Sequence, residues 1–189
     1  YTPMDEAHPT NPLNYYGFTK LKIEELLKWY GQLKGIIGVN LRYFNVAGDG
    51  GLHYVDPDAK NIFPIIMEVL SGKREKLIVY GNDYPTPDGT CVRDYVDVND
   101  LIRAHILALG LEHSETINLG TSQGVSVKEL LDLTEEVLGK KIRWEYGPRR
   151  EGDPAILTAS NEKAKQVLGW EPQVSVREMI KSTFGAYGK

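Results

Sequence analysis

The order in which apolar patterns change along the chain restricts its fold most strongly. Between residues 17 and 33, apolar side chains recur every three to four positions, which is typical of an amphipathic helix. Residues 36–44 follow as a mostly apolar, β-rich run, the pattern of a strand buried on both faces in a parallel sheet. A helix that leads directly into such a strand predicts an α/β architecture.

The same alternation continues to the end of the sequence. We expect a loop over residues 45–61, helices over 63–70, 100–109 and 162–168, and strands over 77–80, 91–98, 116–119 and 142–146. Two capping boxes, Ser126 with Glu129 and Ser175 with Glu178, predict the first turns of two more helices. The expected fold class is therefore α/β, a largely parallel sheet with helices packed on it.

Composition excludes several functions. A formal net charge of −4 gives no general attraction to nucleic acid or to acidic membranes. No apolar run reaches the ~20 residues that span a bilayer, so we expect no membrane partner. The single cysteine, Cys91, excludes an internal disulfide framework and suits a reducing compartment, so we expect a cytoplasmic protein. No metal site is expected, because the histidines lack metal-ligand spacing: His8, His53, His105 and His113.

Tyr16 and Lys20 are the first candidates for chemistry. Their spacing puts a phenol and an ammonium one helical turn apart on the same face. A lysine cation near a tyrosine favours the phenolate, so the pair can accept a proton from a hydroxyl group, as alcohol oxidation requires. The spacing alone indicates little, because 11 tyrosines supply a second pair, Tyr30 and Lys34, that we interpret as surface.

A glycine-rich dinucleotide loop is missing from this sequence. Neither Gly-x-Gly-x-x-Gly nor Gly-x-x-Gly-x-x-Gly occurs in the 189 residues. If the chain belongs to a nicotinamide enzyme, the half that clamps the cofactor lies elsewhere. The first residue is not methionine, and we interpret the chain as a piece of something longer.

Four strings in order carry a resemblance to a known family: residues 14–20 (NYYGFTK), 41–48 (LRYFNVAG), 89–96 (GTCVRDYV) and 149–153 (RREGD). Together they resemble the extended short-chain dehydrogenase/reductase family, and within it the enzymes that epimerise nucleotide sugars at C4. The resemblance implies the C-terminal part of a Rossmann-type NAD(P)-binding fold plus a smaller mixed α/β nucleotide-sugar domain. It also implies an absent N-terminal portion of about 140 residues that holds the glycine-rich loop and a catalytic serine or threonine.

The resemblance further implies domain limits and chemistry. Residues 1–45 would end the NAD-binding domain, and residues 46–189 would form the UDP-sugar domain, with residues 95–120 packing back on the first. Tyr16 would take the proton of the sugar 4-hydroxyl while hydride passes to NAD, and the 4-keto sugar would turn over before hydride returns. Lys20 would also hold the nicotinamide ribose, with Phe44 near the nicotinamide. The intact protein would be a homodimer, and this part alone would be inactive.

The substrate implied is a UDP-hexose, UDP-glucose or UDP-galactose. Arg93 and Arg150 match the family's diphosphate-binding positions, and a guanidinium fork suits phosphate oxygens. The remaining matches are Asn45 at the nucleotide-sugar, Asn61 and Ile62 at the diphosphate or uracil end, Ile78, Val79 and Tyr80 beside the uracil, Asp153 near the ribose, and Leu157 beside the sugar 2-substituent.

Departures from the family pattern leave alternatives open. Leu157 stands where some members have a bulky tyrosine, so we hypothesise that N-acetylated UDP-hexoses are also accepted. Tyr15 replaces a common proline and Asp97 a frequent histidine, and neither change touches the expected chemistry. The alternatives are another nucleotide-sugar epimerase, a 4,6-dehydratase of the same family, and a non-catalytic nucleotide-sugar-binding fragment.

Overall fold

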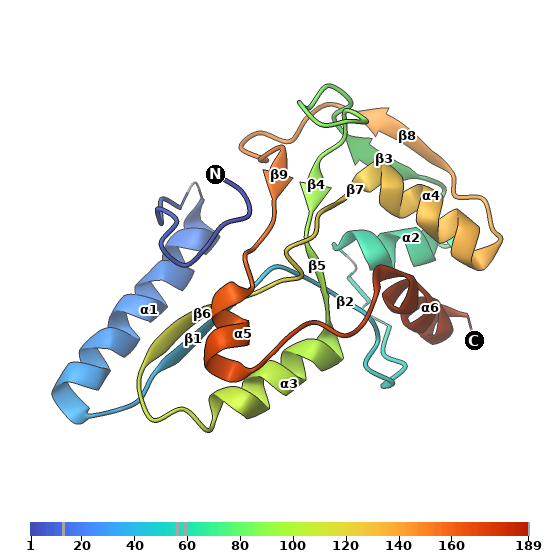
Figure 1. Ribbon diagram of the computed structural model, residues 1–189. Coiled ribbons are helices and arrows are strands. Elements are labelled where there is room, and N and C mark those ends of the chain that lie inside the picture. Colours follow the sequence, from blue (N-terminus) through green and yellow to red (C-terminus); the bar gives the residue numbers. More distant parts are fainter. Residues whose placement is uncertain (13, 56, 59, 189) are drawn as a thin grey trace.

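The computed structural model describes residues 1–12, 14–55, 57–58 and 60–188 and confirms the α/β fold class (Figure 1). Helices and strands alternate along most of the chain. In order, the elements are α1 (Tyr15–Lys34), β1 (Val39–Tyr43), β2 (Asn45–Ala47), α2 (Ile62–Leu70), β3 (Leu77–Tyr80), β4 (Val92–Arg93), β5 (Tyr95–Asp97), α3 (Val98–Ala108), β6 (Glu115–Leu119), β7 (Val125–Ser126), α4 (Val127–Leu138), β8 (Trp144–Gly147), β9 (Ile156–Leu157), α5 (Glu162–Leu168) and α6 (Val176–Tyr187).

Side-chain caps set the helix ends. Asn14 caps α1 by accepting a hydrogen bond from the backbone N–H of Gly17 at 2.8 Å. The same helix ends at Gly35, whose φ of 68° is the left-handed conformation that glycine adopts without strain. Both predicted capping boxes are confirmed, at the starts of α4 and α6. Asp97, at the position where the family often has histidine, caps α3.

The strands form several short ladders instead of one sheet. Among the described residues the sheets are β1–β6, β2–β5, β3–β8 and β7–β4–β9, and the β4–β7 pair alone is antiparallel. The largely parallel pairing is therefore confirmed, and in the described residues it is divided among these four ladders. The two apolar clusters described below pack elements of different ladders together.

Three strand predictions and one loop prediction need correction. The strand expected over 36–44 begins at Val39 and has no buried residue, because β6 is its one hydrogen-bonded neighbour in the described chain. The predicted loop 45–61 begins with the strand β2. The strand expected over 91–98 is split at Asp94, where the chain passes from the β4 ladder to the β5 ladder. The strand expected at 142–146 lies at Trp144–Gly147.

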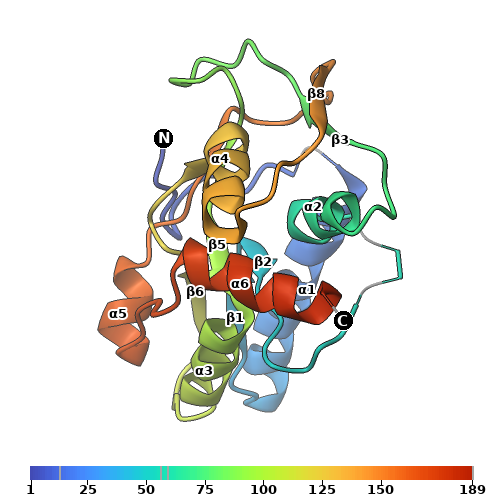
Figure 2. The ribbon, with the colours of Figure 1, turned by 90° about the vertical axis from the view of Figure 1, so that its right-hand side faces the viewer.

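The buried apolar side chains gather in two clusters. One joins α2, α4, α6 and β3, and Figure 2 shows α6 lying against both α2 and α4. The other joins α3, α5, β5 and β6, with β1 packed against it. The register of β6 on β1 runs from the Val39–Glu115 pair to the Tyr43–Leu119 pair. The division into 1–45 and 46–189 stays a prediction.

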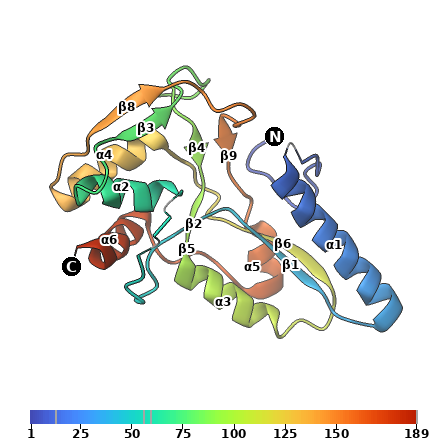
Figure 3. The ribbon, with the colours of Figure 1, turned by 180° about the vertical axis from the view of Figure 1, so that it is seen from behind.

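Helix α1 lies at one edge of the molecule, beyond β1 and β6 (Figure 3). It has no buried residue. A narrow half-buried stripe faces β1, and large apolar side chains on the remaining surface are exposed, among them Phe18, Ile23, Leu26, Trp29 and Leu33. No helix in the described ranges is both long and apolar enough to cross a membrane.

Candidate functional site

The Tyr16/Lys20 pair forms in the folded helix. The Lys20 ammonium lies 5.1 Å from the centroid of the Tyr16 ring, and the ring is 70% exposed. The second pair with the same spacing, Tyr30 and Lys34, makes no such contact within the described chain. The N-terminal end of α1 thus brings a cation to a solvent-accessible phenol, as the spacing predicts.

A cavity of about 320 Å³ lies beside this pair. Lys20 and Phe44 both line it, together with the chain segment before α1 and the end of β1. Tyr16 does not line the cavity, because its ring lies outside it, on the exposed surface of the helix. Two of the three predicted cofactor residues therefore share one cavity, and the third reaches it through its contact with Lys20.

A second cavity, of about 390 Å³, gathers all the predicted substrate residues. They come from the start of β2, the first turn of α2, β3, β4, β9 and the loop between β8 and β9. The lining includes Asn45, Asn61, Ile62, Ile78, Val79, Tyr80, Arg93, Arg150, Asp153 and Leu157. Ten residues spread over 113 positions of sequence thus face one space, which is adjacent to the first cavity through the neighbours Phe44 and Asn45.

Arg93 is the most firmly held cation of this cavity. Its side chain is 11% exposed and donates to the carbonyls of Val92 and Pro154 at 2.8 and 2.9 Å. Its Nη2 donates to the Asp153 carboxylate at 2.5 Å. Register places Leu157 opposite it on β9. Three fixed acceptors orient the guanidinium, and a guanidinium carries five N–H donors, so donors remain for a ligand.

Arg150 and Asn61 flank the opening from two other elements. The Arg150 guanidinium lies 4.1 Å from the centroid of the Tyr80 ring, a cation–π contact that holds the β8–β9 loop toward β3. Asn61 stands at the N-cap of α2, yet its side chain makes no capping hydrogen bond. Its amide group is therefore available to a molecule in the cavity.

Asp94 anchors Asn45, one of the residues that line the substrate cavity. Its backbone carbonyl accepts from the backbone N–H of Asn45 at 3.0 Å and from the side-chain amide of Asn45 at 3.2 Å. Its buried carboxylate accepts from Thr121 and from the Ala159 N–H. Burial raises the pKa of Asp94, and these hydrogen bonds oppose that rise. Gly120 is required beside it, because a Cβ there would lie 2.6 Å from the carboxylate.

Sequence reasoning missed two cations of the substrate cavity. Lys60 and Arg74 line it from either end of α2. Lys60 pairs with Asp58 at 2.7 Å, and Arg74 pairs with Glu68 at 2.8 Å. No motif joins two basic residues that lie 14 positions apart. Their positions just before and just after the apolar helix α2 are the one sequence feature that could have identified Lys60 and Arg74.

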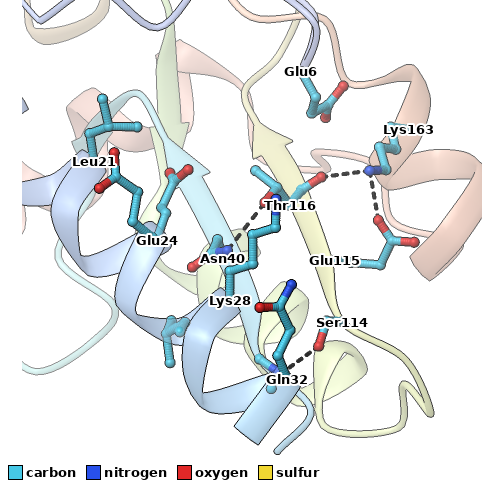
Figure 4. Close-up of a pocket in the computed structure, with 14 residues that line it drawn as sticks. Glu6, Leu21, Glu24, Lys28, Gln32, Asn40, Ser114, Glu115, Thr116 and Lys163 are labelled. Carbon is cyan, nitrogen blue, oxygen red and sulfur yellow. Dashed lines mark hydrogen bonds and ion pairs between the residues drawn. The ribbon is translucent and has the colours of Figure 1, made fainter.

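A wider groove, of about 670 Å³, runs beneath α1 (Figure 4). The helix side chains that face β1 and β6 form one wall, and Asn40 and Thr116, joined at 3.2 Å, lie at its base. Lys163 closes the far side through an ion pair with Glu115 at 2.6 Å. None of the predicted site residues lines this groove. Glu24 borders both the groove and the cavity that contains Lys20.

Comparison with known proteins now identifies the class. A family model described as GDP-mannose 4,6 dehydratase matches residues 1–183, and the chain belongs to that family. The resemblance drawn from the four sequence strings is confirmed by individual relatives and solved structures. The chain is 44% identical over 194 residues to a UDP-glucose 4-epimerase of Rhizobium meliloti, covering 99% of this chain and 59% of that protein. Identity to the Streptococcus mutans UDP-glucose 4-epimerase is 46% over 185 residues, with coverage of 94% and 56%.

Solved structures give the same picture. A UDP-glucose 4-epimerase from Stenotrophomonas maltophila, crystallised with NAD and formylated UDP-arabinopyranose, superposes with a TM-score of 0.94 at 35% identity. The Bifidobacterium longum enzyme, in complex with NAD+ and UDP, gives 0.92 at 34% identity. Each comparison covers 100% of this chain and 59% of the other. The chain thus spans about three fifths of the length of the proteins it matches.

Proposed function

We propose that this chain is part of an NAD-dependent enzyme that epimerises a UDP-hexose at C4, interconverting UDP-glucose and UDP-galactose through a 4-keto sugar. One observation carries the proposal: the ten residues expected to bind the UDP-sugar line a single cavity. The names of its relatives support the same reaction. Because the chain covers 59% of the first of these relatives, we propose that activity requires the remaining portion.

The cavity has the chemistry for a sugar diphosphate. Arg93, already oriented by three acceptors, and Arg150 supply guanidinium donors to the diphosphate oxygens. The apolar strand β3 offers Ile78 and Val79 to a uracil, with Tyr80 beside them. Leu157, opposite Arg93 in the register, borders the sugar. In this arrangement the sugar lies toward Asn45, the side nearest α1.

The base in the proposed reaction is Tyr16. Its phenolate takes the proton of the sugar 4-hydroxyl, and the Lys20 cation, 5.1 Å from the ring, favours that phenolate. The proton returns to the sugar oxygen in the second half of the reaction. Both steps need the sugar to lie within hydrogen-bond reach of the phenol.

NAD, when bound, supplies the acceptor that takes the hydride from C4 and gives it back. The described residues fit one end of it: Lys20 has an ammonium without a carboxylate partner in the described chain, and Phe44 adds an apolar surface in the same cavity. We propose that residues 1–45 end the NAD-binding domain and that residues 46–189 form the UDP-sugar domain. The phosphates of NAD need a glycine-rich loop that these 189 residues lack.

The test is turnover by the full-length protein. With UDP-galactose and NAD we expect UDP-glucose as the product, and a 4-keto-6-deoxy sugar would favour the 4,6-dehydratase alternative instead. UDP binding without turnover of any UDP-sugar would favour the non-catalytic alternative. The 189-residue chain alone is expected to be inactive. Its intact mass, compared with 21.2 kDa, identifies which species a preparation contains.

Substrate range is the finer part of the proposal. Leu157 is smaller than the tyrosine that restricts the sugar pocket in some members, so we propose that N-acetylated UDP-hexoses are accepted. A structural neighbour from Campylobacter jejuni is described as a UDP-Glc/GlcNAc 4-epimerase. Turnover of UDP-glucose with none of UDP-N-acetylglucosamine would contradict this. A cytoplasmic homodimer also stays a prediction, which localisation and sedimentation would test.

A further inference from the structure

Lys20 shares its face of α1 with an acidic residue. Glu24 follows it by four positions, and both side chains line the cavity that contains Phe44. Oppositely charged residues at this spacing lie on neighbouring turns and attract each other. A carboxylate paired with the Lys20 ammonium would cancel the positive charge that favours the Tyr16 phenolate. Something must therefore keep these two neighbours apart.

Arg42 on β1 pairs with both oxygens of the Glu24 carboxylate. Its Nε donates to Oε1 at 2.7 Å and its Nη2 donates to Oε2 at 2.6 Å, a two-pronged pair. The side chains are 27% and 21% exposed, so solvent screens the pair less than a surface one. Figure 4 shows Glu24 on the side of α1 that faces β1. Lys20 forms no ion pair in the described chain, and its ammonium lies over the Tyr16 ring.

We propose that Arg42 is a positioning residue for the catalytic pair: by holding both oxygens of Glu24, it leaves the Lys20 ammonium to Tyr16. The inference rests on the proposed function, in which Tyr16 is the base. It goes further by assigning a task to Arg42, which lines the same cavity as Lys20 and Phe44 but is not among the residues expected to bind substrate or cofactor. Removal of Arg42 frees Glu24 to pair with Lys20, and Tyr16 then loses its proton at a higher pH.

Lys28, four positions after Glu24, lines the groove beneath α1 with it and forms no ion pair in the described chain, so it competes with Lys20 for a freed Glu24. The acidic and histidine side chains near this face are already engaged. From the segment before α1, Glu6 accepts the backbone N–H of Asn118 at 2.7 Å, and Asp5 accepts that of Ala7 at 3.0 Å. His8, from the same segment, contacts the carbonyl of Pro9 at 3.3 Å. The hydrogen bonds from Arg42 to Glu24, and to a lesser degree the charge of Glu6, raise the pKa of the Arg42 guanidinium.

The neighbouring elements add no competing charge to this cavity. Strand β6 contributes the uncharged Asn118. Elsewhere on α1, Lys22 and Glu25 form an exposed pair at 2.6 Å. Neither of these two lines the cavity, so they offer a matched control on the same helix.

The experiment compares three variants of the full-length protein: Arg42→Gln, Glu24→Gln and the double variant. Tyrosinate absorbance is followed against pH, and subtraction of the same titration in a Tyr16→Phe background isolates Tyr16. We expect Arg42→Gln to move the Tyr16 titration up by about one pH unit, with a roughly tenfold lower rate of epimerisation at neutral pH. The double variant has no carboxylate at position 24 to pair with Lys20. Its Tyr16 titration should therefore lie within a few tenths of a pH unit of the wild-type titration.

The control separates charge from loss of structure. Glu24→Gln breaks the same link between α1 and β1 as Arg42→Gln, yet it should not raise the Tyr16 titration. Lys22→Gln leaves Glu25 unpaired on the same helix and should also leave the Tyr16 titration unchanged. Equal upward shifts in Arg42→Gln and Glu24→Gln, or no recovery in the double variant, would overturn the proposal. A wild-type protein without epimerase activity would defeat the proposed function, while the absorbance titration would still decide the role of Arg42.

Discussion

Two helices that carry site residues, α1 and α2, are packed in opposite ways. The 20 residues of α1 include no buried side chain, whereas the nine residues of α2 bury Phe63, Ile66 and Met67. Both helices present a candidate residue at their first turn, Tyr16 on α1 and Ile62 on α2. The substrate cavity is therefore supported by a helix packed into the apolar core. The catalytic pair lies on a helix that contacts the rest of the chain through a few half-buried side chains.

This difference in packing indicates that the chain by itself supports the substrate cavity more firmly than the catalytic helix. The substrate cavity draws its lining from β2, β3, β4, β9 and α2, which are fixed by ladders and by the α2–α4–α6 cluster. The catalytic helix is tied to β1 largely by the Arg42–Glu24 pair and a few half-buried contacts. We therefore expect substitutions on α1 to act on chemistry, and substitutions around α2 to act on stability.

The largest effect is expected at Tyr16. In the full-length protein, Tyr16→Phe removes the proton acceptor, so turnover of UDP-galactose should fall by roughly 10²- to 10⁴-fold. UDP affinity, measured by calorimetry, should stay within about twofold, since the ring lies outside the substrate cavity. Tyr30→Phe, in the other pair of the same spacing on α1, is the matched control and should keep full turnover. A Tyr16→Phe enzyme with the normal rate would remove this helix from the mechanism.

Core packing gives the next largest effect. Ile66→Ala deletes a side chain that is 1% exposed against the α4–α6 cluster, and we expect a loss of about 2–5 kcal/mol in the free energy of unfolding. Leu26→Ala on α1, where the side chain is 57% exposed, should cost under about 0.5 kcal/mol in this 189-residue chain. Urea titrations of both variants measure the difference. Equal losses would mean that α1 packs more tightly than the structure indicates.

A smaller effect is expected at Arg93. Arg93→Gln removes charged donors to a diphosphate, and a loss of about 1.5–3 kcal/mol in UDP binding follows, roughly 10- to 150-fold in Kd. The control is Arg103→Gln, which breaks an ion pair with Asp100 on α3, outside the cavity. Calorimetry with UDP should show no change for the control. An unchanged Kd for Arg93→Gln would mean that the diphosphate does not bind at Arg93.

The smallest effect concerns pH and the loop between β3 and β4. Burial alone would raise the pKa of Asp88, but hydrogen bonds from Ser126 and Thr90 outweigh it and hold that pKa below its ordinary value. Such a carboxylate stabilises the fold above its unfolded pKa of about 3.9 and loses this contribution as pH falls through the lower folded value.

We therefore expect Asp88→Asn to cost about 1 kcal/mol at pH 7 and less at pH 3. Urea titrations at the two pH values measure the gap between wild type and variant. Asn82→Asp, which adds an exposed carboxylate in the same loop, is the control and should show no comparable pH dependence. A gap that widens toward pH 3 would contradict the assignment to Asp88.

Much of the local structure could be predicted because it depends on neighbours in sequence. The Ser126 and Ser175 capping boxes each act within a few residues, and each is found where the pattern indicates. Sheet pairing could not be predicted in the same way. The break at Asp94 and the strand β2 depend on partners that arrive from distant segments.

The sequence by itself determined the α/β class, the helix starts and the four strings that identify the family, because these are properties of local order and residue type. The tertiary structure alone decided which distant residues meet. It put Arg93 on Asp153, Arg150 on Tyr80 and Arg42 on Glu24. Such contacts depend on how strands cross and helices pack, and the free energy of that packing is spread over the whole chain. The Tyr16/Lys20 spacing is local in sequence. The pairing of Arg42 with Glu24, which we propose keeps the Glu24 carboxylate from Lys20, forms only because the fold places β1 beside α1.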